Sequence, residues 1–462
     1  LQRKEVYKVA LVSEKHQEGL MTEGPIARQM ISFAMPLLLG NLFQQLYNAV
    51  DSAVVGHYVG DLALAAVGSS TSLINMIVNL FMGIAVGGSV VISQYYGARD
   101  RTGLHHSIHS VLAFSVIAGI AVTVVGYFLT PQILVWMDTP ENIMPMSVEY
   151  LQIIFLGGIA TVFYNMGSGL LRALGDSRRP LYFLILSSLL NIVLDILFVA
   201  GFHTGVGGAA LATIISQAVS AVLILVVLIR TDEEYKVTLR DIRVYPRQMA
   251  AVIRVGLPSG IQNAIVGFSN VIVQSSINIF GEIAVAGCSA YIKIDGFVIL
   301  PVMSMSMTLT TFVGQNIGAL NYDRVKKGMK TGLAMGVGIT LALTVLLQFL
   351  GGFLLQIFTS DPEVIAYGLQ MMHIVSMGYF LLGISHCLAG TLRGVGLTRV
   401  PMVIMVLCWC VARVAWIVIL GRQLYNLPLV LAGYPVSWLL SAVLLAIYFW
   451  KMDWIHYYEK SM

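Results

Sequence analysis

Charged residues are scarce in this sequence. Only 11% of its 462 residues are Asp, Glu, Lys or Arg, and 57% are hydrophobic, whereas about 25% of residues are charged in an ordinary soluble domain. A water-soluble chain of this length needs more charged surface than these residues supply. The composition therefore excludes a soluble globular protein and indicates that much of the apolar surface faces lipid. At roughly 20 apolar residues per span, about twelve membrane-spanning helices fit.

Cysteine is also scarce, and catalytic motifs are lacking. The four cysteines all lie in apolar runs, without a histidine cluster at zinc spacing: Cys288, Cys387, Cys408 and Cys410. This pattern predicts no disulfide framework, no metal site and no prosthetic cofactor. The sequence contains no HExxH and no Ser/His/Asp cluster. We expect His105, His106 and His109 to be isolated from acids, so a membrane enzyme is the weaker hypothesis.

The first residues lack the apolar core of a secretory signal. Residues 1–20 are polar and charged, and the first apolar run follows directly after Met21 to Pro25. We expect residues 1–29 to form a disordered extension and Met21 to be the native start.

The apolar runs between charged or Pro/Gly breaks predict twelve spans in two sets of six. The first set forms an N-lobe over 30–229, and the second forms a C-lobe over 248–450. A charged linker at 230–247 joins them, and 451–462 is a tail. The predicted spans are 30–55, 63–96, 104–130, 145–171, 180–201, 207–229, 248–280, 284–313, 328–358, 364–392, 400–421 and 427–450.

Basic residues predict the orientation. With both tails counted as inside, all but three of the 27 Lys and Arg residues fall on one side of the predicted spans. The exceptions are Arg422 in an opposite loop and Lys293 and Arg413 within spans. Because Lys and Arg are retained on the cytoplasmic side, we expect a multi-pass protein of the plasma (inner) membrane with both termini in the cytoplasm.

The two halves repeat each other. The segment GLLRALGDSRRP at 169–180 recurs as GTLRGVGLTRVP at 390–401, and QYYGA at 94–98 recurs as QNIGA at 315–319, both at an offset of 221. Six spans per half is an even number, so the halves share one orientation. The sequence therefore predicts an all-α polytopic membrane protein, with twelve transmembrane helices in two parallel-repeat six-helix lobes around a central cavity. Transporters use this architecture for alternating access.

Five ionisable side chains lie within predicted spans: Asp51, Asp195, Lys293, Asp295 and Arg413. A charge at membrane depth costs at least ~2.5–3.5 kcal/mol on insertion scales, so each such residue is a candidate functional group.

Polar side chains accompany the two N-lobe aspartates. Gln44, Asn48 and Asp51 share one helix face, as do Asn191 and Asp195. One interpretation is an interhelical hydrogen-bond network without a transport role. The other is a coupling site, since buried carboxylates can exchange H+ and can also bind Na+; the sequence does not separate the two ions.

The repeat places the coupling site in the N-lobe. At the repeat offset Asp51 corresponds to Val273, and Asp195 corresponds to Trp416 or Ile417. The C-lobe has its own polar set, and we expect Asn263, Asn270, Lys293 and Asp295 to line a C-lobe cavity. Lys293 and Asp295 fall on different helix faces. We expect Arg413 to satisfy helix C-termini or a carboxylate.

Several of these motifs resemble the multidrug and toxic compound extrusion (MATE) family of cation-coupled exporters. The most telling are GNLFQQLYNAVD at 40–51 with VGH at 55–57, QYYGA at 94–98, and the two Arg-Pro loops. The resemblance covers about residues 21–451. It implies two six-helix lobes around a central cavity.

The resemblance is strongest for the DinF-like bacterial branch. It implies that Asp51 and Asp195 are the cation-coupling residues and that Pro36 is the hinge of the first helix. It also implies that Gln44, Asn165, Asn191 and Thr213 line the same pocket, beside Asn48 from the polar stripe. The NorM-like branch carries acids in the C-lobe, where this chain has Val266 and Leu382, which argues against a C-lobe sodium site.

These observations predict a secondary antiporter. It would export amphiphilic, often cationic, drugs or metabolites in exchange for H+ or Na+, acting as a monomer in the bilayer and binding no nucleic acid. The alternatives are a lipid-linked precursor flippase of the same superfamily and, less favoured, a channel or membrane enzyme.

Overall fold

The computed structural model describes residues 20–461, apart from the side chains of 71–73, 75–77, 79, 80, 422, 460 and 461. Every regular element in this part is a helix. The N-lobe contains α2 (Ile26–Tyr58), α3 (Asp61–Gly97), α4 (Arg101–Trp136), α5 (Met144–Leu156), α6 (Gly158–Ala173), α7 (Arg178–Asp195), η1 (Ile196–Gly201) and α8 (Gly205–Arg230). The linker carries η2 (Leu239–Asp241).

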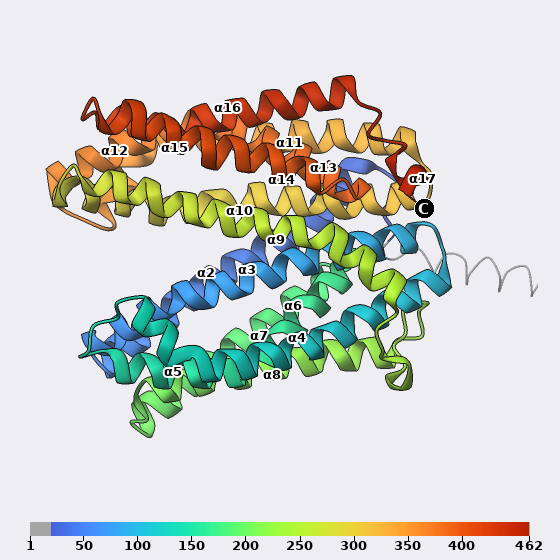
Figure 1. Ribbon diagram of the computed structural model, residues 1–462, viewed down its shortest axis with the longest axis horizontal. Helices are drawn as coiled ribbons and strands as arrows, with labels where there is room; N and C mark the ends of the chain where they lie inside the picture. The colour runs from blue at the N-terminus through green and yellow to red at the C-terminus, as the bar shows by residue number, and fades with distance from the viewer. Residues whose placement is uncertain (1–19, 462) are drawn as a thin grey trace, which may run out of the picture.

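The C-lobe repeats this order. It contains α9 (Pro246–Asn278), α10 (Glu282–Gly318), α11 (Tyr322–Gln356), α12 (Pro362–Ser376), α13 (Tyr379–Val395), α14 (Arg399–Met405), η3 (Val406–Ala412), α15 (Arg413–Trp416), η4 (Ile417–Arg422) and α16 (Leu427–Lys451), followed by α17 (Tyr457–Ser461). Figure 1 shows the two lobes as separate layers of long helices, with α2, α3, α9 and α10 between the outer helices.

The predicted spans are confirmed to within a few residues. Among the described residues searched, nine helices are long and apolar enough to cross a membrane, and two bent pairs, α5 with α6 and α12 with α13, bring the total to eleven. The 37-residue helix α3, part of whose side chains are not described, occupies the position of the remaining predicted span.

Two spans predicted as continuous are broken, at equivalent places in the repeat. The helices α5 and α6 meet at 53° next to Gly157, and α12 and α13 meet at 47° next to Gly378. These glycines are 221 positions apart. A Cβ atom on Gly157 would collide with Ile214, and one on Gly378 would lie 2.7 Å from Pro435. The bends therefore bring each span against its neighbour where only glycine fits.

The expected disorder of residues 1–29 is wrong for its last part. The helix α2 begins at Ile26, and Met21 is only 5% exposed. Arg324 on α11 explains this order, because its guanidinium donates to the carbonyls of Met21 (3.1 Å) and Gly24 (2.8 Å). The prediction for residues 1–19 lies outside the described residues.

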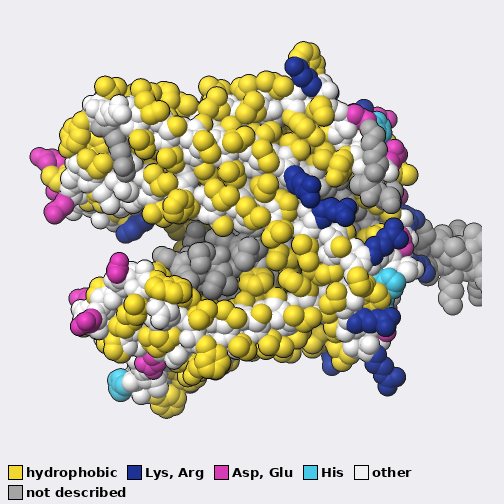
Figure 2. Space-filling model, in the orientation of Figure 1, with side chains coloured by type: hydrophobic (Ala, Val, Ile, Leu, Met, Phe, Trp, Pro, Cys, Tyr) yellow, Lys and Arg dark blue, Asp and Glu magenta, His cyan; other side chains and the backbone are white. Residues whose placement is uncertain are grey.

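The lobes meet tightly at the end where the basic loops lie, which we call the basic end. There Gly97 contacts the backbone of Gln315, and Gly318 contacts the backbone of Gln94. Both glycines belong to the repeated Gln-x-x-Gly segments. Figure 2 shows Lys and Arg gathered at this end and a hollow between the lobes at the opposite end, with acidic side chains near its rim.

Candidate functional site

A cavity of about 470 Å³ lies within the N-lobe and receives side chains from α2, α3, α5, α6, α7 and α8. Its wall contains most of the residues predicted for the site: Pro36, Gln44, Asn48, Asp51, Asn165 and Thr213. Asn191 lies beside it, in a small pocket that shares Gln44 and Thr213 with the larger one. The structure thus gathers the predicted pocket residues of four helices around one space.

The two N-lobe aspartates are neighbours. Asp51 is 8% exposed and Asp195 is fully buried, and their carboxyl groups are within hydrogen-bonding contact of each other. Neither carboxylate can donate such a bond unless one of them carries a proton. The Oδ1 atom of each has no hydrogen-bond partner among the described residues. The pair therefore has acceptor capacity left for a proton or a cation.

Asn191 holds one member of this pair. With its amide oriented so that both ends are satisfied, it donates to Asp195 Oδ2 at 2.9 Å and accepts from the backbone N–H of Thr213 at 3.0 Å. Asn191 and Asp195 are one turn apart on α7, which places them on the same face. The amide thereby links α7 to α8 at the carboxyl pair.

Several cavity residues were not predicted. Tyr47, one turn before Asp51, contacts the Thr213 hydroxyl at 3.5 Å. Thr161 donates to Gln217 and thereby joins α6 to α8. Arg172 lies just beyond the predicted span 145–171 but lines the cavity, because α6 continues to Ala173. The i, i+4 spacing of Tyr47 and Asp51 was a usable signal for Tyr47, whereas nothing in the local sequence marked Arg172.

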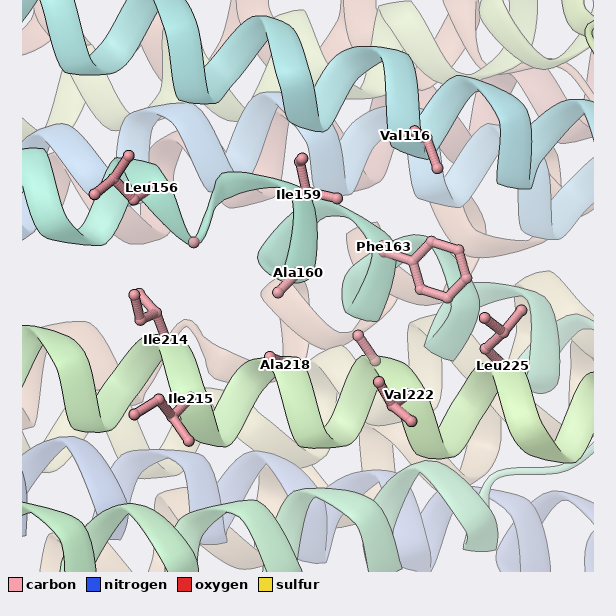
Figure 3. Close-up of a pocket in the computed structure, with 12 residues that line it drawn as sticks. Val116, Leu156, Ile159, Ala160, Phe163, Ile214, Ile215, Ala218, Val222 and Leu225 are labelled. Atoms are coloured by element: carbon pink, nitrogen blue, oxygen red, sulfur yellow. The ribbon is translucent and has the colours of Figure 1, made fainter.

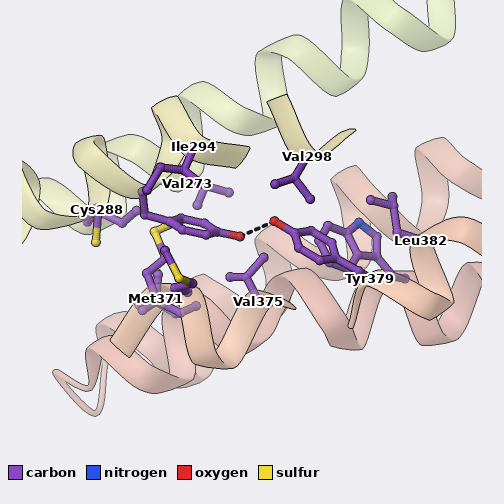
Figure 4. Packing of buried hydrophobic residues seen from close by; sticks show 14 of the residues in the cluster. Val273, Cys288, Ile294, Val298, Met371, Val375, Tyr379 and Leu382 are labelled. Atoms are coloured by element: carbon purple, nitrogen blue, oxygen red, sulfur yellow. Dashed lines mark hydrogen bonds between the residues drawn. The ribbon is translucent and has the colours of Figure 1, made fainter. Parts of the chain in front are cut away.

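The C-lobe acid is embedded in an aromatic core. Asp295 accepts hydrogen bonds from Tyr379 and, at 3.4 Å, from Tyr291. The two tyrosine hydroxyls are also 2.5 Å apart, as the dashed line in Figure 4 shows. Apolar side chains such as Val298 and Leu382 surround them. Asp295 is therefore satisfied by neutral hydroxyl donors.

The four C-lobe residues predicted to line one cavity share no described contact with one another. Lys293 is exposed, and its Nζ lies 5.6 Å from the centre of the Phe358 ring. Asn263 is also exposed, whereas Asn270 accepts from Arg413 at 3.5 Å. Lys293, Asp295 and Asn270 therefore have separate partners, and the separation of Lys293 from Asp295 by helix face is confirmed.

The expected partner of Arg413 is corrected. Its guanidinium donates to Ser437 Oγ at 3.0 and 2.8 Å and lies 4.6 Å from the centre of the Tyr434 ring. Its described partners are thus a hydroxyl, an amide and aromatic faces, and not a carboxylate or a helix C-terminus. The side chain is 2% exposed and ties η3 and α15 to α16.

A second large depression, of about 510 Å³, lies between α4, α6 and α8. Figure 3 shows it lined by aliphatic side chains and Phe163. Several of its residues are strongly exposed, including Leu156 at 54% and Val222 at 57%. A surface of this kind suits contact with acyl chains and offers no group for recognising a polar solute.

The histidines near the start of α4 are less isolated than expected. His105 Nε2 lies 3.5 Å from Asp241 Oδ2 in the linker, and His105, His109 and Asp241 offer ligand atoms within 4.8 Å of one another. His109 uses both ring nitrogens, however, with the carbonyl of His105 (2.7 Å) and the N–H of Thr238 (3.1 Å). This cluster fastens the linker to α4.

The fold and the cavity define a polytopic membrane transporter built from two repeated lobes. The sequence model of the MatE family matches residues 36–197 and 258–419. These two matches are displaced by 222 positions, which confirms the internal repeat. The chain belongs to the MatE (MATE) family of multidrug efflux transporters.

Curated relatives and solved structures agree with this assignment. "Probable multidrug resistance protein YpnP" of Bacillus subtilis is 28% identical and aligns over 94% of this chain and 97% of its own length. "Probable multidrug resistance protein NorM" of Thermotoga maritima is 27% identical over 86% and 87%. An outward-facing MATE transporter of the MOP superfamily superposes with a TM-score of 0.88 at 24% identity, covering 96% of this chain and 99% of that one.

Another fold relative is a MOP superfamily transporter from Pyrococcus furiosus, with a TM-score of 0.86 at 24% identity and coverage of 93% and 96%. The comparisons confirm the predicted two-lobe architecture of twelve transmembrane helices and the prediction that the chain is a multi-pass transporter and not an enzyme. They do not favour the flippase alternative.

Proposed function

We propose that this transporter is an antiporter that exports amphiphilic, often cationic, compounds in exchange for H+, with Asp51 and Asp195 as the coupling residues. The observation that carries the proposal is the direct contact between these two buried carboxyl groups. Two negative charges on neighbouring carboxyl groups repel strongly in a poorly hydrated site. The pair is therefore stable when it holds a proton or another cation, and it strains the site when it holds neither.

The contact between the carboxyl groups supports H+ as the coupling ion. A hydrogen bond between two carboxyl groups needs one shared proton, so the pair is a site at which one proton can be held and released. The amide of Asn191 orients Asp195 in either case. This local arrangement, absent from the C-lobe positions of Val273 and Trp416 or Ile417, also supports assignment to the DinF-like branch.

The cavity wall supports a cationic amphiphile as the substrate. Tyr47, Tyr150 and Tyr164 line it together with the Asp51 carboxyl group. Tyrosine faces attract cations, and their rings also provide apolar contact area. A cationic drug that enters the N-lobe would compete electrostatically with the proton on the aspartate pair, which is the exchange an antiporter requires.

Alternating access follows from the two-lobe architecture. The hollow between the lobes lies away from the basic end (Figure 2). The distribution of Lys and Arg supports a cytoplasmic basic end, with both termini inside and the hollow facing outward. We infer a monomeric exporter in the plasma membrane, in which Pro36 provides the hinge on α2.

Transport into vesicles tests this proposal. The purified protein is reconstituted into liposomes, and a proton gradient or, in a separate experiment, a sodium gradient is imposed across the membrane. Uptake of a fluorescent organic cation is then recorded. Asp51→Asn and Asp195→Asn should abolish proton-driven uptake, while the matched C-lobe variant Asp295→Asn should retain it. Full activity in both N-lobe variants, or uptake driven by sodium alone, would contradict proton coupling at this pair.

A further inference from the structure

The outer surface of the C-lobe carries a groove between α9 and α14, with a volume of about 550 Å³. We call it the α9–α14 groove. Its apolar wall is formed mainly by Ile253, Leu257, Ile261 and Met402, and the basic side chains Arg254 and Arg399 also line it. No acidic residue is among its lining residues. Figure 2 shows basic side chains among hydrophobic ones over this part of the C-lobe.

The two arginines are free to take an external partner. Both are exposed, and within the part of the chain that the structure describes neither forms a hydrogen bond or an ion pair. Two other arginines of the basic end are paired, Arg101 with Glu234 and Arg179 with Asp176. The groove therefore presents two guanidinium groups without an internal counter-ion.

The charges and the apolar wall are ordered along α9. Arg254 lies eight residues into this helix, or roughly 12 Å along its axis from Pro246 at 1.5 Å per residue. Leu257 and Ile261 follow on the same face one and two turns further from the basic end, at exposures of 41% and 39%. A phospholipid whose phosphate lies at the arginines would thus place an acyl chain along Leu257 and Ile261.

The groove is specific to the C-lobe. At the offset that relates Pro36 to Pro258, the N-lobe counterpart of Arg254 is Ser32. At the offset of 221, Arg399 corresponds to Arg178. The N-lobe therefore has only one arginine at these two positions. The charged pair is not a by-product of the duplication.

We propose that the α9–α14 groove binds one anionic phospholipid of the leaflet at the basic end. The guanidinium groups of Arg254 and Arg399 hold its phosphate, and an acyl chain lies against Leu257 and Ile261. Arginine binds phosphate through paired N–H donors and is less strongly hydrated than lysine. The apolar wall selects a lipid over a soluble phosphate compound, because only a lipid buries the wall and satisfies the charges together.

Native mass spectrometry of the full chain, purified in a neutral detergent, tests the proposal. It compares the binding of an anionic lipid, dioleoylphosphatidylglycerol, with that of a zwitterionic lipid, dioleoylphosphatidylcholine. The unsubstituted protein should retain the anionic lipid preferentially. Arg254→Gln with Arg399→Gln should weaken that first binding event by at least about fivefold, since one basic residue near an anionic lipid contributes about 1 kcal/mol. Arg178→Gln with Arg240→Gln removes the same charge from the same end and should leave binding unchanged.

A second variant tests the apolar wall separately. Met402→Trp keeps both arginines and fills the groove, so it should also reduce binding of the anionic lipid. Equal losses in the two arginine pairs would show general attraction to the basic end and overturn the proposal. Undiminished binding in Met402→Trp, or displacement of the lipid by millimolar inorganic phosphate, would likewise overturn it by indicating a site for a free anion.

Discussion

Gln94 and Gln315 occupy equivalent positions in the two repeats, and each donates a side-chain N–H to a backbone carbonyl of the opposite lobe. Gln94 bonds the carbonyl of Gly394 at 2.9 Å, and Gln315 bonds the carbonyl of Ala173 at 3.0 Å. Gly394 and Ala173 are themselves 221 positions apart. The N-lobe glutamine thus reaches the C-lobe and the C-lobe glutamine reaches the N-lobe, which closes the basic end by a reciprocal pair of bonds.

The contact between the lobes at the basic end, which we call the seam, depends on the glycine three residues after each glutamine. A Cβ atom on Gly97 would collide with the backbone of Gln315. We therefore expect Gly97→Ala to separate the lobes at the basic end, because a backbone contact cannot give way as a side chain can. Labelling of a cysteine introduced near the seam should become faster, and the midpoint of thermal unfolding should fall.

Gly68→Ala is the matched control for this seam. It lies on the same helix, α3, and a Cβ atom there would meet nothing within 4 Å. It should leave both labelling and the unfolding midpoint unchanged. If Gly97→Ala behaves like Gly68→Ala, the close backbone contact at Gly97 does not hold the lobes together at the basic end.

Asn191 should be required for coupling although it is not ionisable. Asn191→Ala removes the amide that donates to Asp195 and accepts from Thr213, and a hydrogen bond to a charged group contributes ~1.5–3 kcal/mol. We expect proton-driven export to fall about tenfold or more while binding of detergent-solubilised protein to its substrate is partly retained. The vesicle uptake rate and a fluorescence titration separate these effects.

Ser187→Ala is a suitable comparison for Asn191→Ala. Ser187 lies one turn earlier on α7, and its hydroxyl bonds the carbonyl of Leu184 in its own helix. Export should remain near that of the unsubstituted protein. A similar loss in both variants would indicate a general effect on α7 and would argue against a specific role for the amide.

Arg413 should contribute to stability and not to transport. Arg413→Met preserves much of the apolar volume but removes the two bonds to Ser437 and the contact with the Tyr434 ring. Interhelical hydrogen bonds in membranes contribute about 0.6–1.7 kcal/mol each, so we expect a loss of about 2 kcal/mol in the free energy of unfolding. Denaturant titration in detergent micelles measures this difference.

The exposed residue Lys293 provides the control for Arg413. Lys293→Met removes a basic group of the same lobe whose described contact is with the Phe358 ring and should change the unfolding free energy by less than about 0.5 kcal/mol. Proton-driven export that survives in Arg413→Met at low temperature would support the structural role. Its complete loss in a protein that stays folded would contradict that role.

The sequence predicted the features that depend on periodicity and on repetition. The helix boundaries followed from apolar runs, and Gln44, Asn48, Asp51 and Thr213 could be placed on cavity-facing sides because helical spacing determines which side chains share a face. The failure of the repeat to conserve Asp51 and Asp195 identified the lobe that contains the carboxyl pair. These inferences needed no knowledge of how the helices pack.

Features that depend on packing could not be predicted. The bends at Gly157 and Gly378 arise from close approach to another helix, and a glycine in an apolar run is equally compatible with a straight span. Arg172 looked like a loop residue until the length of α6 was known. The order of residues 21–25 depends on Arg324, which lies some 300 positions away in the chain and leaves no local signal.

The most direct test of the central claim is a count of protons released when the substrate binds. Calorimetric titration of the purified protein in buffers of different ionisation enthalpy yields that number. If a cationic substrate displaces a proton held by Asp51 and Asp195, about one proton should be released per bound substrate, and Asp195→Asn should release none while Asp295→Asn behaves like the unsubstituted protein. Binding without proton release, or the same release in Asp195→Asn, would contradict the assignment of coupling to this pair.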